Sequence, residues 1–334
     1  MQSLDHPLID SFGRVHDSLR ISVTDRCNIR CFYCMPETGA QFAPRDTLLT
    51  FEEIHRLANL LVQRCGVRDI RITGGEPLVR REIDRLVRML ASIDGLQDLS
   101  MTTNGILLAD CAELLHQSGL RRVNISLDTL DEKVFQKITR RSGVEQVVQG
   151  IDAAIACGFE SIKLNTIAIA GITETQIVDL VEFASARNVP LRFIEFMPLD
   201  TDRAWTKGDV LSGDRLLRIL ASRFGTLTEV PRSDPSQPAE EFVFAGGQRV
   251  GIIRSVTAPF CGACNRLRLT ADGSLRNCLF ANGETPLRDL LRDGASDDDL
   301  LCEVKRCVAA KAAGHGMSDA DFTPPPRPMY AIGG

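Results

Sequence analysis

Short apolar runs alternate with amphipathic stretches through the first 200 residues of the chain. The runs are rich in β-branched residues and predict buried strands at residues 18–24, 69–73, 96–103, 122–127, 161–169 and 190–196. The stretches between them carry apolar residues three and four positions apart, which predicts helices at residues 51–65, 80–93, 109–118, 131–138, 144–157 and 174–187. This alternation predicts an α/β protein whose parallel strands curl into a partial (β/α)6 barrel of the TIM type.

Particular residues mark the expected ends of these helices. Thr50 and Thr173 each precede a helical stretch, where a threonine side chain can cap the first amide groups. Gly66, Gly119 and Gly158 each follow such a stretch, where glycine commonly ends a helix.

The pattern changes near residue 200. Residues 229–240 are rich in proline, serine and charge and predict a loop. Residues 241–255 and 266–280 predict two hairpins, the second turning at Asp272-Gly273, and helices are expected at 285–292 and 297–312. We therefore expect two parts, a barrel over residues 1–200 and a C-terminal extension over residues 201–334.

Composition excludes several classes of protein. The chain has 334 residues, is 44% hydrophobic and 25% charged, and carries a net charge of −5, which argues against a general nucleic-acid binder. No apolar run approaches the roughly 18–20 residues of a membrane span, and the first residues do not resemble a secretion signal. We expect a cytoplasmic protein that contacts neither membrane nor nucleic acid.

The eleven cysteines fall into two groups and five isolated residues. An odd number cannot pair completely, and a cytoplasmic chain keeps its thiols reduced. The isolated cysteines lie in helical patterns and are expected to be small buried side chains: Cys65, Cys111, Cys157, Cys302 and Cys307.

The first group is Cys27, Cys31 and Cys34, directly after the first predicted strand. Three thiolates on one loop suit a 4Fe-4S cubane, in which each cysteine binds a different iron and the fourth iron stays open. A structural zinc site fits less well because it needs four ligands. The end of a barrel strand is also where active sites lie.

This cysteine spacing, with Tyr33 before the last cysteine, resembles the radical S-adenosylmethionine (SAM) enzymes. Gly74-Gly75-Glu76-Pro77 after the second strand is similar to the segment with which that superfamily binds the methionine part of SAM. A glycine turn lets backbone groups approach a ligand closely, which is consistent with that role.

The second group is Cys261, Cys264 and Cys278, on either side of the predicted 266–280 hairpin. A zinc knuckle and a second three-cysteine cluster both remain open, although no fourth ligand for zinc is evident. Arg266 and Arg268 share one face of the strand between these cysteines, which suggests an anionic, phosphorylated substrate.

Residues 260–270, 277–279, 24–28, 71–78 and the final Gly333-Gly334 together resemble the GTP 3′,8-cyclase family of molybdenum cofactor biosynthesis, over nearly the whole chain. The resemblance implies two 4Fe-4S clusters, held by Cys27, Cys31 and Cys34 and by Cys261, Cys264 and Cys278. It implies that SAM is bound by Tyr33, Gly75, Ser126 and Met197. It implies that GTP is bound by Arg20, Arg71, Thr102, Lys163, Arg266, Leu267 and Arg268. It also implies that Gly333 and Gly334 enter the active site.

The family's reaction, as the resemblance implies it, begins when an external one-electron donor reduces the first cluster and SAM is cleaved to a 5′-deoxyadenosyl radical. That radical takes hydrogen from C3′ of GTP, and the C3′ radical then bonds to C8. One further electron and a proton complete 3′,8-cyclo-7,8-dihydro-GTP. The resemblance further implies that cyclic pyranopterin monophosphate synthase takes the product. A monomer and a homodimer are both compatible with the sequence.

Three other functions fit parts of the sequence. A radical SAM enzyme acting on a peptide would use the second cysteine group for an auxiliary cluster, but such enzymes commonly carry more cysteines there. An iron–sulfur electron carrier would explain the cysteines without the barrel. A structural zinc protein would explain the second group alone.

Overall fold

The strands expected in the first 200 residues lie side by side, parallel and in chain order. The computed structural model describes residues 7–200, 202, 204–232, 234–317, 319 and 322–333. The strand bounds are β1 (Ser18–Ser22), β2 (Asp69–Thr73), β3 (Asp98–Thr103), β4 (Arg122–Ser126), β5 (Ser161–Ala168) and β6 (Leu191–Glu195).

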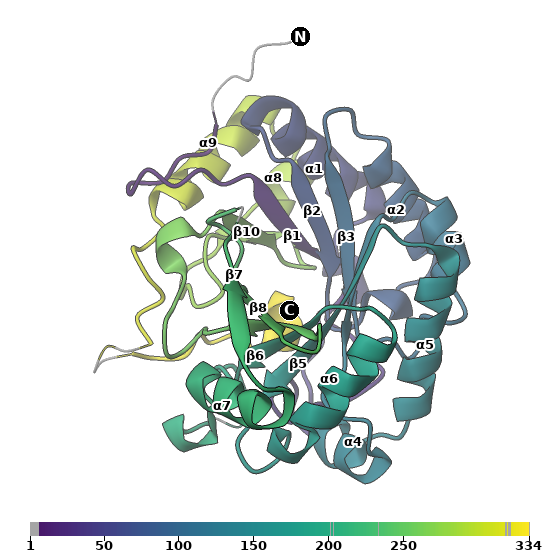
Figure 1. Ribbon diagram of the computed structural model, residues 1–334. Coiled ribbons are helices and arrows are strands. Elements are labelled where there is room, and N and C mark those ends of the chain that lie inside the picture. The colour runs from purple at the N-terminus through teal and green to yellow at the C-terminus, as the bar shows by residue number, and fades with distance from the viewer. Residues whose placement is uncertain are drawn as a thin grey trace.

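Helices cover the outer side of this sheet in an arc (Figure 1). They are α1 (Phe51–Cys65), α2 (Ile83–Ala91), α3 (Ala112–Gln117), α4 (Glu132–Thr139), α5 (Val144–Cys157) and α6 (Ile177–Ala186). Strand residues alternate between the two faces, so Leu19 and Ile21 are buried in the apolar core while Arg20 faces the other side. The prediction of a partial α/β barrel is confirmed.

Most of the expected helix ends are observed. Thr50 and Glu53 form a reciprocal capping box at the start of α1, and Gly66 ends that helix with a φ of 74°. The expectation for Thr173 was wrong, because its hydroxyl bonds to the preceding turn and α6 begins only at Ile177, after a short 3₁₀ turn.

Strands from the C-terminal part extend the sheet at both edges. Beside β1 lie β10 (Arg266–Leu269), β11 (Ser274–Arg276) and β12 (Thr285–Pro286), and beside β6 lie β9 (Arg249–Ile253), β8 (Glu240–Phe244) and β7 (Leu227–Val230). Both hairpins are confirmed as antiparallel pairs. Strand β7 and helix α7 (Gly213–Phe224) were not expected from the sequence.

Three further helices complete the described chain: α8 (Arg288–Arg292), α9 (Asp297–Ala309) and α10 (Met329–Ile332). None of the helices that the structure describes is long and apolar enough to cross a membrane. In Figure 1 the C-terminal end, in yellow, lies within the curve of the strands. The division of the chain near residue 200 stays a prediction, since both parts contribute strands to one sheet.

Candidate active site

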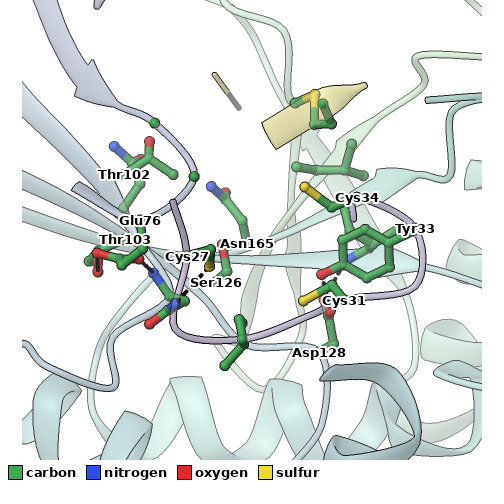
Figure 2. Close-up of a pocket in the computed structure, with 18 of the residues that line it drawn as sticks. Cys27, Cys31, Tyr33, Cys34, Glu76, Thr102, Thr103, Ser126, Asp128 and Asn165 are labelled. Carbon is green, nitrogen blue, oxygen red and sulfur yellow. Dashed lines mark hydrogen bonds between the residues drawn. The ribbon is translucent and has the colours of Figure 1, made fainter. Parts of the chain in front are cut away.

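The first cysteine group lies on the loop that follows β1. Cys27, Cys31 and Cys34 are half-buried free thiols that line one cavity of about 270 Å³ (Figure 2). The loop is tied to the end of α4, where the amide of Phe32 donates to the carbonyl oxygen of Ile138 at 3.0 Å. The sequence thus brings three sulfur ligands to the C-terminal end of the barrel strands, where chemistry is usually placed.

These three cysteines fit an iron–sulfur cubane better than a single metal ion. Across the part of the chain that the structure describes, no three His, Cys, Asp or Glu side chains converge on a point that could hold one ion. In a cubane each cysteine binds a different iron, so the sulfurs stand apart. Burial raises the pKa of Cys34 to about 12, and the nearby Cys27 adds to the shift. Buried thiolates here therefore need a bound cation, which iron supplies.

The segment after β2 packs directly against the cysteine loop. The Gly75 amide donates to the carbonyl oxygen of Thr24 at 2.7 Å, and the Glu76 amide donates to that of Arg26 at 2.8 Å. A Cβ on Gly75 would lie 2.4 Å from the Arg26 carbonyl oxygen, so only glycine fits. A backbone edge without side chains therefore lies beside the cysteines.

Glu76 is a buried carboxyl at the edge of the cavity. Its oxygens accept hydrogen bonds from the Thr103 hydroxyl and the Asn104 amide, both at 2.7 Å. Burial raises the pKa of Glu76 to about 7, although the bond from the Asn104 amide partly opposes the shift. The carboxyl thereby joins the segment after β2 to the end of β3, near Cys27 (Figure 2).

Tyr33 is held by a residue that the sequence analysis did not identify. Its hydroxyl donates to Asp128 at 2.6 Å, and the other oxygen of Asp128 accepts the Ile167 amide at 2.8 Å. Burial raises the pKa of Asp128 to about 6, while the bond from Tyr33 lowers it. Asp128 follows β4 and thus fixes the tyrosine ring between the cysteine loop and the β4–β5 edge (Figure 2).

The inner face of the sheet is cationic. In the sheet register Arg20 of β1 lies between Arg268 of β10 and Arg71 of β2, so three arginines stand side by side. Burial lowers the pKa of Arg71 to about 10, with Arg122 adding to the shift, and burial with neighbouring Arg266 lowers that of Arg268 to about 10. Buried cations that lower one another's pKa are stabilised by a bound anion.

The cavity brings together eight of the expected ligand-binding residues. These are Tyr33, Gly75, Ser126 and Met197 from the SAM set, with Arg20, Arg71, Thr102 and Arg268 from the GTP set. The described lining does not include Lys163, Arg266 or Leu267, and the Leu267 side chain is fully buried in the apolar core. Leu267 could therefore contact a ligand only through its backbone.

The second cysteine group lies at the opposite end of the same strands. Cys261 and Cys264 precede β10, and Cys278 follows β11. Since β10 runs parallel to β1 and antiparallel to β11, all three lie beside the N-terminal end of β1. The first group follows the C-terminal end of β1, so the arginines of the inner face lie between the two groups.

Nearby cations favour the metal-binding, deprotonated form of a cysteine in the second group. Burial would raise the pKa of Cys264, but the cations of Arg266 and Lys311 outweigh it and lower that pKa to about 6. Cys264 is therefore a thiolate at neutral pH, as a ligand must be. The Nε and Nη2 atoms of Arg266 are buried and have no hydrogen-bond partner among the described residues, which suits an anionic ligand nearby.

Within the part of the chain that the structure describes, no fourth protein ligand for zinc lies at this group. His315 has the right chemistry for a zinc ligand. However, its Nε2 donates a hydrogen bond to the Ser255 carbonyl oxygen at 3.2 Å, and its Nδ1 accepts one from the Met317 amide at 3.1 Å. Both ring nitrogens are thus in use. The donor set fits a second cubane with an open iron better than a tetrahedral zinc site.

The C-terminal segment reaches the inner face of the barrel. Gly333 has a φ of 92°, and its carbonyl oxygen accepts a bond from Arg268 Nη1 at 2.5 Å. A Cβ on Gly333 would lie 2.7 Å from that of Ser22 and 2.9 Å from the Thr73 hydroxyl. The segment therefore enters a space that admits only glycine, and Gly334 lies outside the described residues.

A few contacts anchor this segment upstream. Both outer nitrogens of Arg327 donate to the carboxylate of Asp272, at 2.9 and 2.6 Å, and its Nε pairs with Glu284 at 3.1 Å. The Tyr330 hydroxyl donates to the carbonyl oxygen of Gln41 at 3.2 Å. The turn between β10 and β11 thus holds the chain that leads to Gly333.

Comparison with known proteins agrees with this arrangement. Residues 21–184 match the sequence model of the radical SAM superfamily, and residues 189–317 match that of the Molybdenum Cofactor Synthesis C domain. A GTP 3′,8-cyclase of Rhodopirellula baltica is 64% identical, over 98% of this chain and 92% of its own length. The chain belongs to the GTP 3′,8-cyclase family. A second family member, from Rhodococcus opacus, is 46% identical over 99% of this chain and 94% of its own length.

Solved structures share the fold at much lower identity. Streptococcus suis SuiB bound to S-adenosylmethionine superposes with a TM-score of 0.59 at 14% identity, covering 87% of this chain and 66% of that one. The enzyme anSMEcpe with bound AdoMet gives 0.58 at 15% identity, covering 84% and 81%. Membership in the GTP 3′,8-cyclase family therefore rests on sequence, and the radical SAM fold on both comparisons.

Sequence reasoning missed three residues of this site: Asp128, Arg192 and Lys311. Arg192 lines the cavity from β6 and is buried with Glu241 as a distant partner, 3.8 Å away. Arg20 and Arg71 were expected from the family resemblance, which did not include Arg192, although Arg192 is likewise a cation within an apolar strand. Asp128 and Lys311 gave no such signal, because their partners lie far away in the sequence.

Proposed function

We propose that this chain converts GTP into 3′,8-cyclo-7,8-dihydro-GTP by radical SAM chemistry, the first step of molybdenum cofactor biosynthesis. The activity follows from membership in the GTP 3′,8-cyclase family. The observation that supports it most directly is the cavity lined by the first cysteine group, in which three free cysteines and three buried arginines share one wall.

The cluster that binds SAM would lie at the C-terminal end of the barrel strands, held by Cys27, Cys31 and Cys34. When bound, the cluster and SAM supply a 5′-deoxyadenosyl radical, which removes hydrogen from C3′ so that C3′ can bond to C8 of guanine. The chain's own contribution is placement: the backbone of Gly75, which lines the cavity, would accept the methionine amino group, and Asp128 holds Tyr33 in position. Ser126 and Met197 would contact the rest of SAM.

The arginines of the inner face, which lie between the two cysteine groups, would hold the substrate. A triphosphate carries about four negative charges, which offset the mutual repulsion of Arg20, Arg71 and Arg268. Thr102 and Lys163 would add polar contacts, and Arg266 with the backbone of Leu267 would complete the set. Cys261, Cys264 and Cys278 would hold the second 4Fe-4S cluster, whose open iron takes the guanine.

The C-terminal glycines would close the cavity beside the C-terminal ends of β1 and β2. Gly333 already lies against Ser22 and Thr73 and bonds Arg268, so it occupies space that water could otherwise enter. Gly334 would extend this contact. Exclusion of water protects a carbon radical from side reactions.

The proposal includes the cellular setting. We infer a cytoplasmic enzyme, since all eleven cysteines are free and iron–sulfur clusters need reducing conditions. An external one-electron donor and a downstream cyclic pyranopterin monophosphate synthase would be its protein partners. We infer no nucleic-acid or membrane partner, and a monomer or a homodimer.

Anaerobic reconstitution followed by incubation with GTP, SAM and a strong reductant tests the proposal. The expected result is about eight irons per chain, with 5′-deoxyadenosine and a cyclised nucleotide formed together. The product has the same atoms as GTP, because one hydrogen atom leaves C3′ and one electron from the reductant and one proton are gained. Chromatography must therefore separate the two before mass analysis. About four irons with zinc, or SAM cleavage without any change in GTP, would contradict the proposal.

A further inference from the structure

We propose that Lys311 is a positioning residue for the second cysteine group, and that its ammonium raises the reduction potential of the cluster held there. The inference rests on the second cluster proposed above. It goes beyond the ligands and the substrate contacts, because Lys311 lies outside the cysteine motif and does not line the cavity.

Lys311 is a buried cation with unusual neighbours. Only 4% of it is exposed, yet within the described ranges no carboxylate forms an ion pair with it. Its Nζ donates to the Arg266 carbonyl oxygen at 3.0 Å and to the Cys264 sulfur at 3.5 Å. A buried ammonium is costly without an anion, and negative charge on the sulfurs of Cys264 and Cys278 would stabilise it.

The other side of Lys311 is occupied by a neutral histidine. Lys311 Nζ lies 3.5 Å from His16 Nδ1, and an ammonium can only donate, so this ring nitrogen must accept. The proton of His16 is then on Nε2, which donates to Asp10 at 3.0 Å. Burial, with the charge of Lys311, also lowers the pKa of His16, which agrees with a neutral ring.

The acid at the end of this chain of contacts is already paired. Asp10 accepts a bond from Arg14 Nε at 2.6 Å, so its charge does not neutralise Lys311. Arg14 also donates to the carbonyl oxygens of Cys261 at 2.8 Å and Ala312 at 2.7 Å. The N-terminal segment thus fixes both the cysteine turn and the residue next to Lys311, with a net positive charge left facing the sulfurs.

A fixed cation and an N–H···S hydrogen bond both raise the reduction potential of a cluster. Reduction adds negative charge to the iron and sulfur atoms, and both interactions stabilise that added charge. Removing them therefore makes the second cluster harder to reduce. The first cluster, at the other end of β1, would not be affected.

The test compares Lys311→Met with the wild type as reconstituted holoenzymes. Methionine keeps an unbranched side chain, one heavy atom shorter than that of lysine, and removes the charge and the donor. Lys305→Met, an exposed lysine on the neighbouring α9, is the matched control. Redox titrations followed by electron paramagnetic resonance give both midpoint potentials, with added SAM marking the signal of the first cluster and added GTP that of the second.

The expected result is a shift of the second cluster's midpoint to more negative potential in Lys311→Met alone, with wild-type values in Lys305→Met. Equal midpoints in Lys311→Met and wild type, each with about eight irons, would overturn the inference. If Lys311→Met assembles only the first cluster, Lys311→Arg decides: recovery of the second cluster supports a required cation, and no recovery contradicts it. A wild-type chain with about four irons and zinc would instead refute the proposed second cluster.

Discussion

Arg268 and Gly333 are 65 residues apart in the sequence and meet on the inner face of the barrel, where the guanidinium donates to the glycine carbonyl oxygen at 2.5 Å. Arg268 also stands beside Arg20 in the sheet register, within the set expected to bind GTP. The C-terminal segment and the substrate would therefore share one arginine. A change in either partner should affect how the substrate is held.

We predict that Gly333→Ala lowers turnover without unfolding the protein. The φ of 92° and the 2.7 Å approach to Ser22 would cost about 1–3 kcal/mol, so the segment should leave its position. At saturating GTP and SAM, kcat should fall roughly tenfold or more. Gly171→Ala, which shares a positive φ but has open space around it, is the control and should keep wild-type turnover.

We predict that Arg327 and Asp272 act as one anchor for the same segment. Arg327→Gln and Asp272→Asn should each lower kcat and speed amide hydrogen exchange over residues 329–333, since either change breaks the paired hydrogen bonds. The double variant should show a coupling energy of about 1–2 kcal/mol in stability. Asp289→Asn is the control, because its pair with Arg288 lies on the surface. Fully additive effects would count against a shared anchor.

We predict that GTP binding depends on the charge of Lys163. Burial, with the nearby Arg192 and Arg122, lowers the pKa of Lys163 to about 8. Below pH 8 the side chain is charged and attracts the triphosphate, while above it binding must take up a proton. The Kd for GTP should therefore rise by up to about tenfold per pH unit above 8.

Equilibrium binding of GTP from pH 7.5 to 9 measures this dependence. Lys163→Met should bind GTP more weakly, and its Kd should no longer show the increase above pH 8 that depends on Lys163. Lys137 is exposed, so Lys137→Met should behave as the wild type. The same pH profile in Lys163→Met and the wild type would show that another group titrates.

We predict that the two cysteine groups are separable in function. Cys264→Ala should lose cyclisation of GTP while retaining reductive cleavage of SAM, because the first group lies at the other end of β1. Any of Cys27→Ala, Cys31→Ala or Cys34→Ala should abolish both. Quantifying 5′-deoxyadenosine and the nucleotide product gives the comparison, and Cys302→Ala, exposed on α9, is the control. Loss of SAM binding in Cys264→Ala with GTP affinity intact would contradict this division.

Local signals in the sequence predicted much of the fold. The bounds of α1, α5 and β2 agree with the prediction to the residue, because strong periodicity coincides with a cap such as Thr50 or a glycine stop such as Gly158. Helix α7 carried the same kind of signal, with Ser212 as its cap, and was overlooked. Strand β7 is half-exposed and defined by its pairing with β8, so its own pattern is weak.

Some residues of the candidate site could be identified from the sequence and others could not. Spacing alone identified both cysteine groups, because iron–sulfur ligands lie close in the chain. Side chains whose role depends on distant partners were not accessible from the sequence: Asp128 acts on Tyr33 across 95 residues, and Lys311 reaches Cys264 across 47. Thr173 failed as a helix cap because its hydroxyl found nearer backbone partners.

We propose that this cavity places C3′ of GTP beside the radical derived from SAM. The direct test is anaerobic incubation of GTP carrying deuterium at C3′ with SAM, a strong reductant and the reconstituted enzyme. We expect 5′-deoxyadenosine to contain one deuterium atom in place of hydrogen, in proportion to the cyclised nucleotide formed. Unlabelled 5′-deoxyadenosine alongside cyclised product would contradict it, because the hydrogen would then have come from elsewhere.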